Sequence, residues 1–93
     1  PAAAAKFLTP AIAGPLHSLR DALASPGDWT VETITAAFHR VLAEHELKLG
    51  KLAQPVRVAV TGGTASPGIF EVLDILGRER TLARLDAALG RIS

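Results

Sequence analysis

Apolar residues recur at intervals of three and four positions through most of this 93-residue chain, and that spacing favours helices over strands. The pattern is clearest between Thr30 and His45, where Ile34, Phe38 and Val41 follow one another at i, i+4 and i+7. A stripe of this kind covers one face of a helix, which must be buried against other elements. The sequence therefore predicts a mainly helical protein with a shared core.

Residues that start and stop helices divide the chain. Thr30 can cap a helix that runs to about residue 45, and Trp29 before it can fold onto Ile34 as a hydrophobic staple. Ser66 followed by Pro67 suits a cap and a first helical position. The predicted helices cover residues 10–24, 30–45 and 66–77, and a last helix follows Gly77.

The segment from Lys51 to Thr61 has no single local interpretation. Val56, Val58 and Val60 alternate as they would in a strand, whereas Pro55 suits the first turn of a helix. Local reasoning leaves both structures open.

Composition excludes several classes of protein. The chain has no cysteine, so disulfides, thiolate zinc sites and cysteine nucleophiles are absent and packing alone stabilises the fold. Its apolar stretches are broken by Lys6, Arg57 or Gly62 well before the roughly 18 residues that a membrane span needs. We expect a soluble chain, and the first residue, Pro1 rather than Met, favours a piece of a longer protein.

Charge is unevenly distributed although the formal net charge is only +1. Residues 1–47 hold three basic and five acidic side chains, and residues 48–93 hold seven and four. The second half is therefore the better candidate for a surface that binds a polyanion. The alternative is an ordinary solvated helix surface with local ion pairs.

Catalytic patterns fail on a required residue. His45 and Glu46 begin a zincin-like motif, but Leu49 stands where the second histidine is needed. Gly63 and Gly68 have the spacing of a phosphate-binding loop, yet the lysine and hydroxyl residue that should follow are absent. We predict no catalytic residue and no metal ligand.

Four short motifs occur in order along the chain: DWT at 28–30, QPVRVAVTG at 54–62, SPGIFE at 66–71 and LGRER at 76–80. With them, residues 28–89 resemble the C-terminal anticodon-binding domain of bacterial glutamyl-tRNA synthetases. The resemblance implies an all-α fold, a compact bundle of about five helices. Residues 51–61 would then be a helix, with Pro55 in its first turn or just ahead of a continuing turn. The chain, 1–93, would be a single domain or fragment, with a helical lead-in over 1–27 and an anticodon-binding helical module over 28–93.

The resemblance also implies a site for unpaired bases. In the family, the arginine of the first long motif and the turn that begins the next helix face the anticodon. A guanidinium can form two hydrogen bonds to one base edge, and backbone groups of a turn can read another. Without the resemblance, Arg57 could equally pair with Glu71 or Asp74. The implied anticodon-binding residues are Arg57, Ser66, Pro67, Gly68, Ile69 and, more weakly, Gln54, with Lys51, Arg78, Arg80 and Arg84 as phosphate contacts.

By resemblance, the parent protein is a class I glutamate-tRNA ligase that attaches glutamate to its tRNA with ATP and magnesium. The catalytic domain would lie elsewhere in the parent chain, so this part would need no cofactor and would have no ligase activity alone. We expect a cytoplasmic monomer that binds the anticodon loop of the glutamate tRNA and no membrane. The alternatives are a DNA-binding helix-turn-helix and a helical protein-interaction module.

Overall fold

The computed structural model describes residues 8–25, 27–61 and 68–92, and within them the chain forms five helices and no strand. The prediction of an all-α bundle of about five helices is confirmed. The helices are α2 (Pro10–Ala24), α3 (Val31–His45), α4 (Leu49–Thr61), α5 (Ile69–Leu76) and α6 (Arg78–Ile92).

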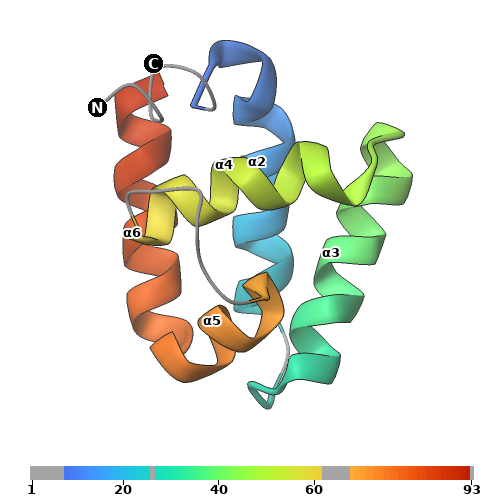
Figure 1. Ribbon diagram of the computed structural model, residues 1–93, viewed down its shortest axis with the longest axis vertical. Coiled ribbons are helices and arrows are strands. Elements are labelled where there is room, and N and C mark those ends of the chain that lie inside the picture. Colours follow the sequence, from blue (N-terminus) through green and yellow to red (C-terminus); the bar gives the residue numbers. More distant parts are fainter. Residues whose placement is uncertain (1–7, 26, 62–67, 93) are drawn as a thin grey trace.

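The helices form two layers. In Figure 1, α6, α2 and α3 lie side by side with their axes roughly along the long dimension of the molecule, and α2 is the central one. This order agrees with the contacts, because α2 packs extensively against both α3 and α6. Helix α4 crosses in front of this layer. The shorter α5 lies below α4 in this view, against α3 and α6.

The core lies between the layers. Leu16, Leu19 and Leu23 of α2 are fully buried, and they meet the stripe of α3 that contains Ile34 and Phe38. The ring of Phe38 meets that of Phe70 from α5 edge to face, with centroids 5.1 Å apart. This contact ties the front layer to the back one.

The start of α3 is set by its own sequence. The Thr33 amide donates to Thr30 Oγ1 at 3.1 Å, and the Thr30 amide donates to Thr33 Oγ1 at 3.0 Å, which is a reciprocal capping box. The predicted cap is confirmed. At the other end, Glu46 takes the left-handed conformation with φ 53°, and the Leu47 amide donates to the Leu42 carbonyl at 2.9 Å. This arrangement ends the helix at residue 45, as predicted.

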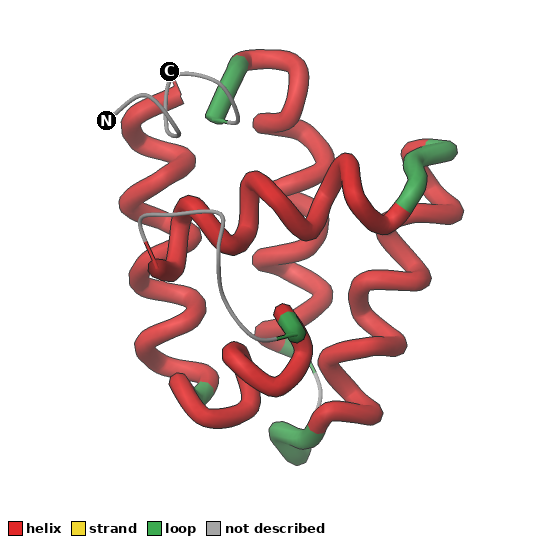
Figure 2. The backbone as a smooth tube through the Cα atoms, viewed as in Figure 1, coloured by secondary structure: helices red, strands yellow, loops and turns green. Residues whose placement is uncertain are grey.

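The ambiguous segment is a helix. Figure 2 shows α4 as one continuous coil, and it begins at Leu49, two residues before the predicted segment. Leu52, Val56 and Val60 are four residues apart and all lie in the core, so burial at helical spacing outweighs the β-branched side chains. Pro55 lies inside the helix, beyond its first turn. Of the two predicted places for this proline, the first turn is therefore wrong, and the place just ahead of a continuing turn agrees with the structure.

The start of α5 differs from the prediction. Gly68 is the N-cap residue, with φ −49° and ψ 136°, and the Val72 amide donates to its carbonyl at 3.1 Å. The predicted start with Pro67 at the first helical position is therefore wrong by two residues, because glycine is a poor residue inside a helix and a tolerated one at its cap. Ser66 and Pro67 themselves lie outside the described residues.

An ion pair joins two helices of the back layer. Arg20 Nε of α2 donates to Asp86 Oδ1 of α6 at 2.9 Å, and hydrogen bonding to this carboxylate raises the pKa of Arg20. In the part of the chain that the structure describes, no helix is long and apolar enough to cross a membrane.

Candidate nucleic-acid interface

The outer side of α4 carries a polar stripe. Lys51, Gln54, Arg57 and Thr61 are spaced by three, three and four residues, so they lie in one row along the helix. Lys51 and Thr61 are exposed, and the two residues between them are half-buried. We call these four residues the α4 stripe. It is the place where the structure puts the predicted base-reading arginine.

Two buried polar atoms of the stripe have no partner in the described part of the chain. They are Arg57 Nε, a donor, and Gln54 Oε1, an acceptor, one turn apart. The alternative in which Arg57 pairs with Glu71 or Asp74 is not realised among the described residues. Because a buried polar atom without a partner is unfavourable, both side chains would be stabilised by a movement that brings these atoms to a complementary group.

The turn before α5 is described only from Gly68 onwards. Gly68 is exposed, whereas the side chain of Ile69 lies in the core with 4% of its surface exposed, so Ile69 can offer a ligand only its backbone. A Cβ added at Gly68 would lie 2.3 Å from Glu71 Oε2. The carboxylate therefore folds back over the first turn of α5, where unpaired amides attract negative charge. Because α4 and α5 contact each other, Arg57 and this turn belong to adjoining helices.

The predicted phosphate contacts fall into two groups. Lys51 and Arg80 are exposed, and Arg80 makes no hydrogen bond or ion pair within the described ranges. Arg84 Nη1 instead donates to the Val60 carbonyl near the end of α4. Arg78 Nη2 donates to the Asp28 carbonyl at 2.9 Å. Lys51 and Arg80 are thus the cations of this set with the most freedom to meet a phosphate.

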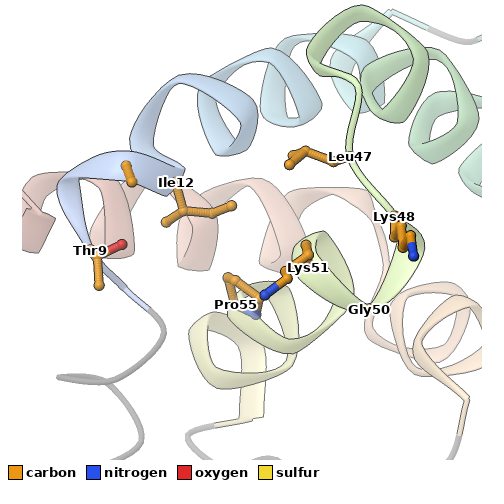
Figure 3. A pocket seen from close by; sticks show the side chains of 8 residues that line it. Thr9, Ile12, Leu47, Lys48, Gly50, Lys51 and Pro55 are labelled. Carbon is orange, nitrogen blue, oxygen red and sulfur yellow. The ribbon is translucent and has the colours of Figure 1, made fainter.

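A groove lies at the other end of α4 from Thr61. It has a volume of about 770 Å³ and lies between the start of α2, the turn after α3 and the start of α4 (Figure 3). Ile12 and Pro55 form apolar walls, and Lys48 and Lys51 stand at its edge. The groove lacks the donor and acceptor pair that makes the middle of the α4 stripe suited to a base edge.

Several of these contacts have no local signal in the sequence. Arg84 is 24 residues from its carbonyl partner, and the indole of Trp29 donates to the Leu73 carbonyl, 44 residues away. The position of Glu71 had no such signal either, because the sequence predicted Ser66 as the cap and the residue three positions after it is Ile69. Among the described residues, no three potential metal-ligating side chains come together.

Comparison with known proteins defines the class. The anticodon binding domain family matches residues 1–89, and the chain belongs to this family. The glutamate-tRNA ligase of Syntrophobacter fumaroxidans is 48% identical over 89 residues, which are 96% of this chain and 19% of that protein. Glutamate-tRNA ligase 1 of Erythrobacter litoralis is 53% identical over 72 residues, 77% of this chain and 15% of that protein.

A solved structure shows the same architecture. The crystal structure of a glutamate tRNA ligase from Elizabethkingia meningosepticum superposes with a TM-score of 0.89 at 25% sequence identity, over 98% of this chain and 18% of that one. The chain thus spans about a fifth of the length of the ligases it matches. The helix-turn-helix and protein-interaction alternatives receive no support from these relatives.

Proposed function

We propose that this chain binds the anticodon loop of the glutamate tRNA as the anticodon-binding part of a glutamate-tRNA ligase. The single observation that carries the proposal is the pair Arg57 Nε and Gln54 Oε1 on the α4 stripe, two buried polar atoms that have no partner among the residues the structure describes. An unpaired base presents both donors and acceptors on its edge, and this pair offers one of each. Membership of the anticodon binding domain family supports the choice of ligand.

The individual residues take the roles that the resemblance implies, and exposure decides between the candidate phosphate contacts. Arg57 and Gln54 read a base, and the turn at Ser66, Pro67, Gly68 and Ile69 contributes backbone groups. Lys51 and Arg80 contact phosphates, which position the RNA without specifying a sequence. The parent enzyme attaches glutamate using ATP and magnesium in a catalytic domain outside this chain, and it works in the cytoplasm as a monomer.

The test is Arg57→Ala, measured by the fluorescence anisotropy of labelled RNA stem-loops. One stem-loop carries the glutamate anticodon and the other an exchanged anticodon on the same stem. Loss of a two-bond contact to a base is worth about 1 to 3 kcal/mol, or roughly five- to 150-fold in Kd, and it should fall on the cognate RNA alone. Gln54→Ala should show a smaller loss of the same selective kind.

Arg40→Ala is the matched control. Arg40 is an exposed arginine of α3 whose Nε contacts Glu44 Oε1 at 3.3 Å, outside the α4 stripe, so its removal should leave both affinities unchanged. Equal losses for the two stem-loops in Arg57→Ala would reject base reading. Preference for duplex DNA over either stem-loop would favour a helix-turn-helix, and no RNA binding at low salt would favour a protein-interaction module.

A further inference from the structure

The C-terminal end of α5 is held by a residue from a distant loop. Trp29 is half-buried just before α3, and its Nε1 donates to the Leu73 carbonyl at 2.9 Å. The same carbonyl accepts the Gly77 amide at 3.0 Å, which closes the last turn of the helix. Gly77 then turns the chain with φ 89°, a conformation that favours glycine, and α6 begins at the next residue. The indole thus fixes the point where α5 ends.

Arg78, the first residue of α6, holds that loop in turn. Its Nη2 donates to the Asp28 carbonyl at 2.9 Å, and its guanidinium carbon lies 5.5 Å from the centroid of the Trp29 ring. A planar guanidinium can stack on an indole and hydrogen-bond sideways at the same time, which an ammonium cannot do. Asp28, Trp29, Leu73 and Arg78 therefore form one connected unit, which we call the Trp29–Arg78 clamp.

The clamp acts on the predicted anticodon turn through the length of α5. This helix has eight residues, so its two ends are about 12 Å apart. A rotation of about 10° around the clamped end would move Gly68 by about 2 Å, whereas a binding site needs its groups within about 0.5 Å. Ile69 and Leu73 lie in the core and Phe70 packs against it, so apolar contacts hold one face of the helix, and the clamp adds the polar contacts that fix its C-terminal end. The orientation of the turn therefore depends on the clamp together with these core contacts.

We propose that Arg78 is a positioning residue for the anticodon-facing turn, acting through Trp29 and α5, and not a phosphate contact. The proposal rests on the proposed function for its ligand. It differs from a phosphate role in three measurable ways: the effect of lysine, the salt dependence of binding, and the environment of the indole.

The main experiment compares Arg78→Ala, Arg78→Lys and Arg80→Ala in the 93-residue chain, with the cognate stem-loop at several salt concentrations. We expect Arg78→Ala to weaken binding by about three- to tenfold, with an unchanged slope of log affinity against log salt. Arg78→Lys should behave in the same way, because lysine keeps the charge but not the stacked plane. Arg80→Ala should instead flatten the slope by roughly 0.7 to 0.9, as expected for one lost phosphate contact.

A second readout needs no RNA. Trp29 is the only tryptophan of the chain, so its emission reports the clamp directly. Both Arg78 variants should shift the emission to longer wavelength and increase quenching by acrylamide, whereas Arg80→Ala should leave the spectrum unchanged. Far-UV circular dichroism checks that each variant folds. Trp29→Phe, which removes the indole donor, provides a second route to the same loss of affinity if Arg78→Ala fails to fold.

A double-mutant cycle tests whether Arg78 acts through the indole. In the Trp29→Phe background, Arg78→Lys should weaken binding by less than it does in the wild type. Restoration of binding by lysine together with a flatter salt slope in Arg78→Ala would make Arg78 a phosphate contact and overturn the proposal. Unchanged binding in Arg78→Lys and Trp29→Phe would overturn it as well. If the wild type binds no stem-loop, the proposed function fails first and this inference falls with it.

Discussion

Helices α3 and α4 lie against each other but satisfy their polar groups by different means. The ends of α3 are closed by neighbouring residues, with a capping box at Thr30 and Thr33 and the left-handed Glu46 after its last turn. On its outer face Arg40 and Glu44 pair with each other at 3.3 Å, one turn apart. Every one of these contacts is local in sequence.

In α4 the corresponding polar groups either bond to other parts of the molecule or have no partner in the described part of the chain. Pro55 lies inside the helix and removes one backbone hydrogen bond. The Val60 carbonyl near the end accepts from Arg84 of α6, and the stripe leaves Arg57 Nε and Gln54 Oε1 without partners in the described part of the chain. The difference teaches that α3 satisfies its polar groups with neighbouring residues, whereas α4 depends on the rest of the molecule and leaves two buried polar atoms without partners in the described part of the chain.

The largest expected effect comes from removing a buried side chain that packs α4 against the core. Leu52 is completely buried, and Leu52→Ala should lower the free energy of unfolding by about 2 to 5 kcal/mol, because a cavity adds to the lost transfer energy. Urea denaturation gives this value. Leu52→Met, which keeps the volume, should lose less than about 1.5 kcal/mol. A loss below 1 kcal/mol in the alanine variant would mean that α4 holds itself together locally, which would remove its contrast with α3.

The second largest effect concerns the C-terminal end of α4. Arg84→Ala removes the donor to the Val60 carbonyl, and we expect the free energy of unfolding to fall by about 1 to 2 kcal/mol, as for a hydrogen bond from a charged group. Arg80→Ala, an exposed arginine on the same helix, should change it by less than about 0.5 kcal/mol. Equal values for the two variants would show that the end of α4 does not depend on α6.

The same contrast explains how far the sequence could predict this protein. The bounds of α3 follow from Thr30, Thr33 and the apolar stripe, because all these signals act within one helix. The state of residues 51–61 did not follow from local pattern, since the valines and Pro55 pointed in opposite directions and burial decided between them. The resemblance to glutamyl-tRNA synthetases predicted that helix.

The candidate site was predictable only in part. Motif resemblance placed Arg57 and Gln54 on one segment, and helical spacing then puts them in one row. The hydrogen bonds that Arg78 donates to the Asp28 carbonyl and Arg84 to the Val60 carbonyl could not be predicted. Each acceptor is at least 24 residues away, and every residue has a backbone carbonyl whatever its side chain. The roles given to the site residues stay predictions until RNA binding is measured.

A smaller effect tests the local cap of α3. Thr30→Ala removes the side-chain acceptor of the Thr33 amide and should lower the free energy of unfolding by about 1 kcal/mol. Thr30→Ser keeps the hydroxyl oxygen and should retain most of the stability, as judged by urea midpoints at equal slope. If serine and alanine unfold at the same urea concentration, the cap contributes nothing and α3 is not closed by its own residues.

The smallest effect should be a gain. Glu46 adopts φ 53° and ψ 48° at the end of α3, and a residue with a Cβ is strained in this left-handed conformation. Glu46→Gly should therefore raise the free energy of unfolding by about 0.5 kcal/mol, since relief of the strain outweighs the greater freedom of glycine in the unfolded chain. Glu46→Ala is the control, because it removes the same carboxylate but keeps the Cβ, and it should bring no gain. Equal gains in the two variants would trace the effect to charge, whereas a gain with glycine alone would show that one local substitution improves the end of α3.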